Sequence, residues 1–324
     1  MSDSTVLTVP QELVEFLRSY NSFIIAGHKE PDGDCIGSQV ALASALQRLN
    51  KNTYLVNPGP FDRQEIADQE SLFSQTIPTT VDPAPDAVVV LDCSSADRIG
   101  SIADEIDGLP LAVVDHHAAG DRFGDVLFIR PEIPSTTMLV QAIFKELGLE
   151  PTEAEAQVLF LGLVTDTGFF RFLAPEQYTA YTAAADLLQA GASPRVTDQV
   201  ISSGRTLESR LLIARQLQRV ETIRDGEILL TFQTRADEKE FGKRRDSDAL
   251  YRLLLAVDGV RVIAVAKEKE QGTAVSFRAT DQTDVGTFAG RFGGGGHQKA
   301  AGAFVEEDLQ TFLPRLRAAL SEIP

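Results

Sequence analysis

The chain has 324 residues, more than one hydrophobic core usually organises, so its length favours two domains over one. Hydrophobic residues make up 43% and charged residues 24% of the sequence, which excludes a disordered or fibrous protein. The 30 Lys and Arg residues against 47 Asp and Glu residues give a net charge of −17. This charge excludes a protein that binds long duplex nucleic acid through diffuse positive charge, but it leaves small or short substrates open.

The cysteines and the apolar runs indicate where the protein works. Cys35 and Cys93 are too few for a disulfide framework, and residues 1–16 lack the basic start and apolar core of a signal peptide. Apolar runs such as residues 87–91 are far shorter than the ~20 residues of a membrane-spanning helix. We therefore expect a soluble protein of the reducing cytoplasm that has no membrane partner.

Short β-rich runs alternate with helical patterns over residues 1–190. This alternation predicts an α/β fold, with a parallel sheet that is covered by helices on both faces. The predicted strands and helices are residues 23–26, 37–49, 53–56, 87–91, 111–114 and 136–147, followed by three helices that begin near Thr152, Glu176 and Pro194.

The pattern changes after about Ser203 and predicts a second, smaller α/β domain. Its elements are a helix at residues 207–219, strands at 227–233, 261–267 and 273–278, and a terminal helix at 309–320. We expect a first domain over residues 1–190, a flexible joint over 191–207, and a second domain over 208–324 across a cleft from the first. Residues 1–204 hold 11 Lys and Arg against 29 Asp and Glu, so the first part carries −18 and residues 205–324 carry +1.

Acidic and histidine side chains follow three of the predicted strands. They are His28, Asp32 and Asp34 after the first strand, Asp92 at the end of residues 87–91, and Asp115, His116 and His117 at the end of the next. Ligands of parallel sheets bind at the carboxyl ends of the strands, so these side chains point to one shared site. A turn around Gly33 explains the first motif equally well, and a cap explains Asp92 alone. Three strands that all end in Asp or His favour the shared site.

Asp166 ends an apolar helical segment, and taken alone it is typical of a helix terminus. Together, the imidazoles and carboxylates suit a divalent metal such as Mn²⁺ better than an all-oxygen Ca²⁺ site. The candidate ligands are too many for one ion. Two ions that share a carboxylate form the arrangement used for in-line attack of water at phosphorus.

A glycine-rich segment at residues 293–302 is the candidate site in the second part. Its glycines allow backbone N–H groups to converge on an anion, and His297 and Lys299 can add donors. A flexible loop is the commoner explanation of such a run. Arg278 and Arg291 are candidate phosphate contacts, although isolated arginines are usually solvated surface residues.

Together these motifs resemble the DHH phosphoesterase superfamily with its DHH-associated C-terminal domain, over nearly the whole chain. The chain is most similar to the NrnA-type bifunctional oligoribonucleases and pAp phosphatases. The resemblance implies that His28, Asp32 and Asp92 hold one Mn²⁺ ion and that Asp34, Asp92, His116 and Asp166 hold the second. It further implies that His117 contacts the scissile phosphate or protonates the leaving oxygen, and that Asp115 orients the imidazoles.

The resemblance also implies substrate contacts. Ser135 and Thr136 open a helix where N–H groups and hydroxyls could meet phosphate, and a plain helix cap is an equal alternative. Arg278, Gly295, Gly296 and His297 would hold the terminal phosphate and the neighbouring base. The chain departs from the family pattern at Cys35, where a small apolar residue is usual, and at Ala279, where Ser is usual.

The implied function is hydrolysis of short 5′-phosphorylated oligoribonucleotides to mononucleotides and of pAp to AMP, by a protein for which a homodimer is the default. The alternative is a cyclic-di-AMP phosphodiesterase. An inorganic pyrophosphatase and a non-catalytic nucleotide sensor are less favoured, and length and acidity disfavour a processive exonuclease of the RecJ type. Both cysteines follow predicted ligands, which raises the hypothesis of redox sensitivity, but packing as small hydrophobic residues is favoured.

Overall fold

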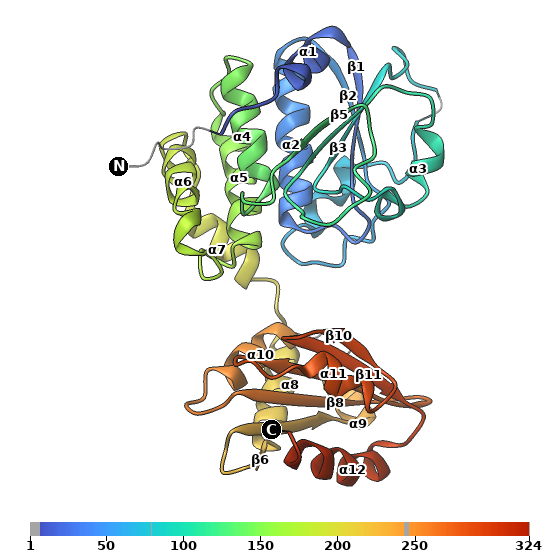
Figure 1. Cartoon of the computed structure of the whole chain (residues 1–324), viewed down its shortest axis with the longest axis vertical. Helices are drawn as coiled ribbons and strands as arrows, with labels where there is room; N and C mark the ends of the chain where they lie inside the picture. The colour runs from blue at the N-terminus through green and yellow to red at the C-terminus, as the bar shows by residue number, and fades with distance from the viewer. Residues whose placement is uncertain (1–6, 79, 243–245, 324) are drawn as a thin grey trace. The chain divides into compact units, whose positions relative to one another are not determined.

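The computed structural model describes residues 7–78, 80–242 and 246–323. The chain divides into two compact units, Met1–Ser203 and Gly204–Pro324, which we call the N-terminal and C-terminal units. Each unit is built on a sheet of its own with hydrophobic clusters packed against it (Figure 1).

The N-terminal unit contains a five-stranded, all-parallel sheet with the strand order β2-β1-β3-β4-β5. The strands are β1 (Ser22–Gly27), β2 (Asn52–Val56), β3 (Ala87–Leu91), β4 (Leu111–Asp115) and β5 (Val126–Ile129). The central strand β3 is an uninterrupted apolar run, β1 departs from one only at Ser22, and both are buried along their whole length, as expected where both faces of a sheet are covered. The sequence predicted the first four strands and missed β5, a short edge strand with mixed burial.

Helices cover both faces of this sheet, as predicted. Ile25 and its alternating neighbours pack against one layer of helices, whereas Ile24 on the opposite face packs against residues of η2 and α3. Figure 1 shows α1, α2, α4 and α5 on one side of the strands and α3 on the other. The helices of this unit are α1 (Gln11–Ser19), α2 (Gly33–Arg48), η1 (Ala67–Leu72), η2 (Ala96–Ile99), α3 (Ile102–Glu105), α4 (Thr136–Glu146), α5 (Glu153–Asp166), η3 (Pro175–Gln177), α6 (Thr179–Gln189) and α7 (Pro194–Ser202).

Helix α2 begins at Gly33, four residues before its predicted start at residue 37, which was therefore wrong. The reason is local, because the Asp32 side chain accepts hydrogen bonds from the backbone N–H groups of Asp34 and Cys35 and caps the helix. Gly33 and Asp34 thus form the first turn of α2 rather than a separate tight turn. Helix α7 lies within residues 191–207, the stretch expected as the joint between the two parts.

The C-terminal unit contains a six-stranded mixed sheet with the order β10-β11-β9-β8-β7-β6, in which β7 and β8 pair in parallel and the other neighbours pair antiparallel. The glycine-rich segment is part of this sheet, because Gly295–His297 form strand β10. The elements are α8 (Leu207–Gln218), β6 (Glu221–Ile223), β7 (Ile228–Gln233), α9 (Arg235–Phe241), α10 (Ser247–Leu255), β8 (Val262–Lys269), β9 (Gly272–Ala279), α11 (Val285–Gly290), β10 (Gly295–His297), β11 (Ala300–Val305) and α12 (Leu309–Ser321).

Candidate metal centre

The fold of the N-terminal unit gathers the predicted metal ligands at one edge of its sheet. His28 follows β1, Asp92 follows β3 and His116 follows β4, so the carboxyl ends of three adjacent strands meet there. The helix layer contributes the others, because α2 begins beside Asp32 and α5 ends at Asp166. We call this set of six residues the His–Asp cluster: His28, Asp32, Asp34, Asp92, His116 and Asp166.

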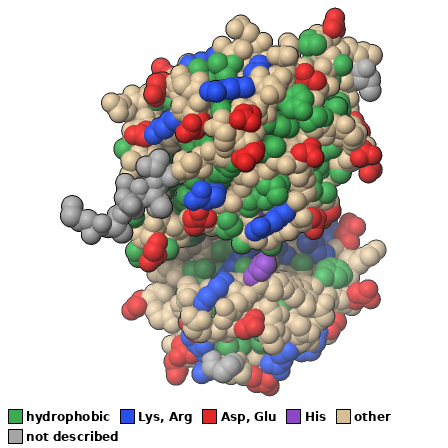
Figure 2. Space-filling view, turned by 45° about the horizontal axis from the view of Figure 1, so that its top comes forward, with side chains coloured by type: hydrophobic (Ala, Val, Ile, Leu, Met, Phe, Trp, Pro, Cys, Tyr) green, Lys and Arg blue, Asp and Glu red, His purple; other side chains and the backbone are tan. Residues whose placement is uncertain are grey.

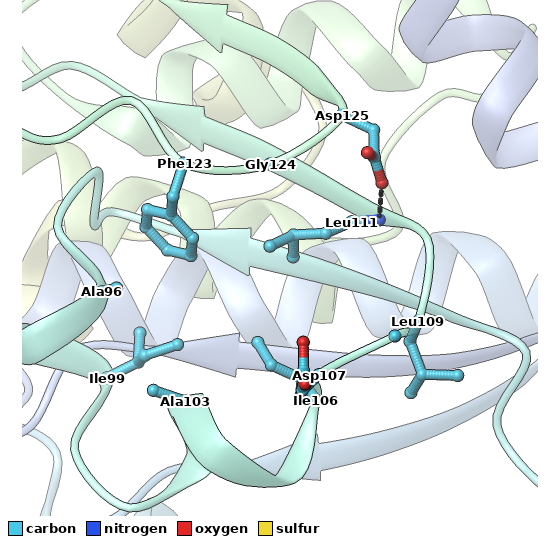
Figure 3. Close-up of a pocket in the computed structure, with 11 residues that line it drawn as sticks. Ala96, Ile99, Ala103, Ile106, Asp107, Leu109, Leu111, Phe123, Gly124 and Asp125 are labelled. Carbon is cyan, nitrogen blue, oxygen red and sulfur yellow. Dashed lines mark hydrogen bonds between the residues drawn. The ribbon is translucent and has the colours of Figure 1, made fainter.

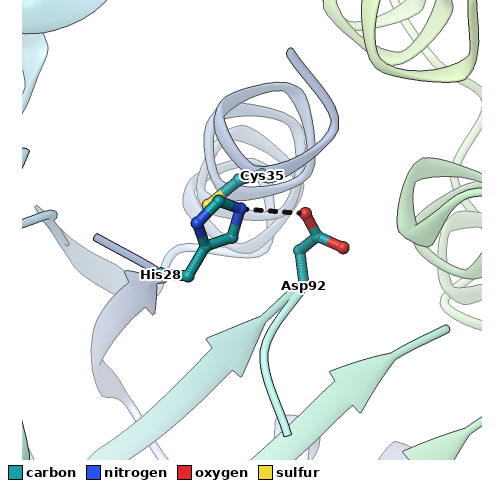
Figure 4. Close-up of side chains that lie close together, drawn as sticks. All are labelled: His28, Cys35 and Asp92. Atoms are coloured by element: carbon teal, nitrogen blue, oxygen red, sulfur yellow. Dashed lines mark ion pairs between the residues drawn. The ribbon is translucent and has the colours of Figure 1, made fainter. Parts of the chain in front are cut away.

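One half of the His–Asp cluster is centred on His28. Its Nε2 atom lies 3.4 Å from Asp92 Oδ2 and 3.9 Å from Asp32 Oδ1. The side chains of His28 and Asp92 are almost completely buried, and Figure 4 shows them facing each other beside the start of α2.

The other half is centred on His116. Its Nε2 atom lies 3.4 Å from Asp166 Oδ2, 3.6 Å from Asp92 Oδ1 and 3.8 Å from Asp34 Oδ2. The two carboxylate oxygens of Asp92 therefore face the two imidazoles, one each. This is the geometry expected of a carboxylate shared by two adjacent sites.

A divalent metal fits this donor set. His116 Nε2 is buried and has no hydrogen-bond partner among the described residues, although three carboxylates surround it. Ligand atoms held about 2.1 Å from one ion lie roughly 3.0–3.6 Å apart, close to the separations observed here. Small side-chain adjustments would bring the donors of each half onto a common centre.

The electrostatics of the cluster also favour a cation. Burial and the nearby Asp92 carboxylate raise the pKa of Asp34 to about 7. Burial together with the Asp34 and Asp92 carboxylates raises the pKa of Asp166 to about 8. Burial acts to raise the pKa of Asp32 as well, but its interaction with His28 outweighs this and holds the pKa well below its usual range. Divalent cations would stabilise the charged forms of all these carboxylates.

Backbone and side-chain acceptors orient the three imidazoles. His28 Nδ1 lies 2.8 Å from the Lys29 carbonyl oxygen and His116 Nδ1 lies 3.2 Å from the Ile133 carbonyl oxygen. Because a carbonyl can only accept, these contacts favour a proton on each Nδ1 atom and leave each Nε2 atom to face the cluster.

His117 differs from these two imidazoles because its partner is a carboxylate. His117 Nδ1 lies 2.8 Å from Asp115 Oδ1, which also accepts from the backbone N–H groups of His116 and His117. The Asp115 hydrogen bond raises the pKa of His117 to about 9 against the opposing effect of burial. The His117 side chain is 43% exposed, so Asp115 orients an imidazole that solvent or a ligand can reach.

Ser135 and Thr136 are occupied by the cluster itself. Ser135 Oγ donates to Asp34 Oδ1 over 2.6 Å, the Thr136 N–H donates to Asp34 Oδ2 over 2.6 Å, and Thr136 Oγ1 donates to Asp92 Oδ1 over 2.9 Å. Both residues are completely buried. The helix start, for which phosphate contact and a plain helix cap were equal alternatives, holds two carboxylates of the cluster in place, and Ser135 also caps α4.

The candidate residues of the C-terminal unit share one face of its sheet. Arg278 of β9 pairs with Ala300 of β11, which in turn pairs with His297 of β10, so the three side chains form one row. The Arg278 guanidinium lies 4.6 Å from the centre of the Tyr251 ring, a contact that sequence analysis missed. His297 is exposed.

The glycines beside His297 leave backbone exposed. Gly296 has φ +146°, and a Cβ atom there would lie 2.6 Å from the Ala300 carbonyl oxygen, so a side chain is excluded. Gly295 has open space around it. By contrast, the other candidate arginine, Arg291, pairs with Glu322 and is not free for a phosphate.

Cys35 lies beside His28 and Asp92 in Figure 4, and its environment is that of a packed thiol. Gln39 Nε2 donates to the carbonyl oxygens of Ile25 and Val56, so Gln39 Oε1 faces Cys35 Sγ at 3.5 Å and accepts from it. Burial raises the pKa of the Cys35 thiol to about 12. Cys93 is buried too. Both cysteines therefore match the favoured alternative of small packed residues.

Hollows in the N-terminal unit differ in how close they lie to the His–Asp cluster. One, of about 580 Å³, adjoins Asp92 and His117 and is lined also by Ser94, Ser95 and Arg98. Arg98 Nη2 lies 3.3 Å from His28 Nδ1, a neighbour that sequence analysis missed. Another hollow, of about 350 Å³, lies between the η2–α3 segment and β4, where Figure 3 shows Ile99, Leu111 and Phe123 around it. Of these two hollows, the one lined by Asp92 and His117 adjoins the His–Asp cluster.

Comparisons with known proteins agree with this arrangement. Residues 22–163 match the N-terminal domain of the DHH family, and residues 232–322 match the DHHA1 domain. The chain is 31% identical, over 92% of its length and 89% of the relative, to the bifunctional oligoribonuclease and PAP phosphatase NrnA of Thermus thermophilus. The chain belongs to the DHH family. The predicted family, and with it the predicted class of hydrolases acting on phosphate esters, is confirmed.

Other DHH-family relatives carry related names. The NrnA of Bacillus subtilis is 23% identical over 91% of this chain and 92% of its own length. The cyclic-di-AMP phosphodiesterase PdeA of Listeria monocytogenes is 25% identical over 89% of this chain, which spans only 45% of that protein.

Solved structures confirm the fold. A crystal structure of an exopolyphosphatase-related protein from Bacteroides fragilis matches with a TM-score of 0.79 at 20% identity, over 96% of this chain and 95% of that one. The exonuclease RecJ bound to manganese matches with a TM-score of 0.54 at 15% identity, over 98% and 97% of the two chains. Among the described residues, no helix has the length and apolar character to cross a membrane.

Proposed function

We propose that this DHH-family protein hydrolyses short 5′-phosphorylated oligoribonucleotides to mononucleotides, and pAp to AMP. The observation that carries the proposal is the His–Asp cluster, in which one carboxylate faces two imidazole-centred halves. The similarity to two NrnA proteins over nine-tenths of the chain supports the choice of substrates. Short substrates also suit a chain whose N-terminal unit carries a net charge of −18, because such a unit repels extended nucleic acid.

The metal assignment follows the two halves of the cluster. His28, Asp32 and Asp92 would hold one divalent ion, and Asp34, Asp92, His116 and Asp166 would hold the other, with Mn²⁺ as the metal that mixed ligands favour. When bound, such a pair of ions supplies an activated water and charge neutralisation at phosphorus. Ser135 and Thr136 fix the carboxylates of Asp34 and Asp92 through hydrogen bonds, so the donors are held in place before substrate arrives.

The leaving group has a candidate proton donor in His117. Its Nδ1 atom is held by Asp115, which leaves Nε2 as the ring atom that can contact the scissile phosphate or the leaving oxygen. The hollow of about 580 Å³ beside His117 offers room for that part of the substrate, and its Ser94 and Arg98 side chains supply polar contacts.

Substrate binding is assigned to the C-terminal unit. Arg278, Gly295, Gly296 and His297 would hold the terminal phosphate and its base, since a guanidinium, an imidazole and exposed backbone N–H groups are all suited to an anion. We thus assign catalysis to residues 1–190 and substrate binding to 208–324, with residues 191–207 as the joint. The two matched family segments lie on either side of that stretch.

A substrate panel tests the proposal. Single-turnover rates of the purified protein with Mn²⁺ would be measured on pApA, pGpG, a five-nucleotide RNA, pAp, cyclic-di-AMP and pyrophosphate. We expect the linear dinucleotides and pAp to react fastest. The similarity to PdeA makes cyclic-di-AMP the second candidate, and a clear preference for it would replace the first proposal. Turnover of pyrophosphate alone, or of nothing in the panel, would contradict both.

A further inference from the structure

The segment that follows Asp166 has an unusual backbone. Gly168, Phe169 and Phe170 have φ values of +56°, +55° and +65°, so three successive residues lie in the left-handed region. Two of them are bulky aromatic residues, for which this conformation is unfavourable. Backbone outliers of this kind cluster at functional sites, where the surrounding structure holds them in place. We call residues 168–172 the Phe turn.

Several contacts over-determine the conformation of the Phe turn. The Phe169 N–H donates to the Val164 carbonyl over 2.7 Å, and the Phe170 N–H donates to Thr167 Oγ1 over 3.2 Å. The Phe170 ring stacks on the Tyr181 ring with 4.9 Å between centres. These contacts fix the Phe turn to α5 and α6, so Arg171 and Phe172 at its exposed end are held in place.

The residues that the turn displays are Arg171 and Phe172. The Phe172 side chain is 73% exposed, the largest value among the described large hydrophobic residues. Its ring packs on the backbone of Gly168, where a Cβ atom would come within 2.2 Å of it. Arg171 Nε donates to the Gly168 carbonyl over 2.6 Å, and the guanidinium lies 5.7 Å from the centre of the Phe172 ring.

The Phe turn lies close to the His–Asp cluster. The Phe172 N–H donates to the carbonyl of Thr167, the residue directly after Asp166. The Cα atoms of Phe172 and Asp166 are therefore roughly 11 Å apart at most, since consecutive Cα atoms are about 3.8 Å apart. Asp166 Oδ2 in turn lies 3.4 Å from His116 Nε2.

Arg171 keeps its charge available. In the part of the chain that the structure describes, its contacts are with the Gly168 carbonyl and the Phe172 ring and no carboxylate pairs with it, although the unit that contains it is strongly acidic. An exposed ring face and an unpaired guanidinium together match the two parts of a nucleotide, its base and its phosphate.

We infer that the Phe turn is the nucleobase-recognition element of the catalytic unit. Phe172 stacks on the base of the nucleotide whose phosphate reaches the His–Asp cluster, and Arg171 donates to a phosphate of the same substrate. This inference rests on the proposed function. It adds a reason why the site would prefer nucleotides to phosphate chains that carry no base. The left-handed backbone then serves to place the ring beside Asp166.

A cycle that combines a protein change with a substrate change tests the inference. KM would be measured for wild type and Phe172→Ala with 5′-phosphorylated ApA, and with analogues in which one or the other nucleotide is abasic. Base stacking on an aromatic ring corresponds to roughly 5- to 150-fold in affinity. We expect Phe172→Ala to raise KM for ApA about tenfold and to leave KM unchanged for one of the two abasic analogues, because the stack is already missing there. Arg171→Ala should raise KM for all three.

A second readout does not depend on turnover. A dinucleotide that carries 2-aminopurine should lose fluorescence on binding to wild type in the presence of EDTA, and Phe172→Tyr should preserve this quenching while Phe172→Ala abolishes it. Leu188→Ala removes a 40% exposed side chain from α6 and is the matched control for a change at the surface. Equal KM increases for ApA and both abasic analogues, or quenching that survives in Phe172→Ala, would overturn the inference. If wild type hydrolyses none of these substrates but binds the fluorescent dinucleotide through Phe172, the proposed function fails and the inference stands.

Discussion

The candidate functional residues of the two units differ in how exposed they are to solvent. In the N-terminal unit the Asp34 and Asp92 carboxylates of the His–Asp cluster are buried, and hydrogen bonds from Thr136 hold both of them. In the C-terminal unit Arg278 and the exposed His297 lie in one row on a sheet face, beside glycines that carry no side chain. Charged groups that must hold cations need a fixed geometry and low solvation, whereas a phosphate-binding surface must admit and release its ligand.

The formal charges follow the same division. The N-terminal unit carries −18 and the C-terminal unit +1. Figure 2 shows acidic side chains spread over the visible surface rather than gathered in one patch. Four of the 29 acidic residues of the N-terminal unit lie in the His–Asp cluster, where a pair of divalent cations would neutralise their charge.

The largest expected effect is that of Asp92→Asn, because Asp92 faces both halves of the cluster. The change keeps the size of the side chain and removes its charge, so we expect metal content and turnover to fall together, turnover by roughly 10³-fold. Elemental analysis and single-turnover rates measure the two quantities. Asp97→Asn, an exposed acid of the same segment, is the control. A variant that keeps both metal and activity would break the assignment of the N-terminal unit to metal binding.

Arg278→Ala tests the C-terminal unit. Loss of a charge-assisted hydrogen bond to phosphate should raise KM by about 10- to 100-fold and leave metal content unchanged. The control is Arg291→Ala, since Arg291 is already paired with Glu322. If Arg278→Ala changed metal content and not KM, the division of roles between the units would be wrong.

Thr136→Val tests whether the helix start of α4 positions the carboxylates. The change removes the hydrogen bond to Asp92 Oδ1 but keeps the side-chain shape. Residues behind metal ligands typically contribute 10- to 100-fold to metal affinity, and we expect a weakening of about tenfold in calorimetric titration with Mn²⁺. Thr287→Val in the C-terminal unit should leave the titration unchanged. A loss of substrate affinity at unchanged metal affinity would return Thr136 to the role expected from sequence.

The smallest effect concerns stability and pH. Burial and like charge raise the pKa of Asp34 to about 7 and that of Asp166 to about 8, whereas both are about 4 in an unfolded chain. Between these values the folded state binds more protons than the unfolded state, so the free energy of unfolding without metal should fall as the pH rises from about 4 to 8. Urea unfolding in EDTA at pH 5 and pH 8 measures this fall, which Asp166→Asn should reduce. If the free energy of unfolding falls equally with pH in wild type and in Asp166→Asn, the raised pKa of Asp166 would be contradicted.

Sequence reasoning pointed to five members of the His–Asp cluster because their signal is local, whereas Asp166 was included only through the family resemblance. A polar residue directly after a buried apolar strand has only one edge of a parallel sheet to occupy, as His28, Asp92 and His116 illustrate. Sequence reasoning missed β5, because this strand is too short and too mixed in burial to give a periodic pattern. It also placed the start of α2 too late, because the Asp32 cap lets the helix begin at Gly33, where a tight turn was expected.

The partners of the cluster were invisible in sequence because they come from distant segments. Thr136 reaches Asp34 and Asp92 from another helix, so a motif that resembles a phosphate-binding helix start became a support for carboxylates. Tyr251 under Arg278 has no local signal either, since one is on α10 and the other on β9. The left-handed conformation of Phe169 and Phe170 is equally unexpected, because their aromatic side chains disfavour it.

The sequence by itself thus determined the α/β class, the parallel sheet and the family, and it supplied the residues for which we propose metal binding. These follow from periodicity, from strand ends and from motifs, all of which are properties of short stretches of chain. Only the tertiary structure showed that Asp92 faces both imidazoles, that the Thr136 hydroxyl donates to it, and that Phe172 is exposed. Those outcomes depend on contacts between residues up to a hundred positions apart, such as Ser135 with Asp34, and no local pattern encodes them.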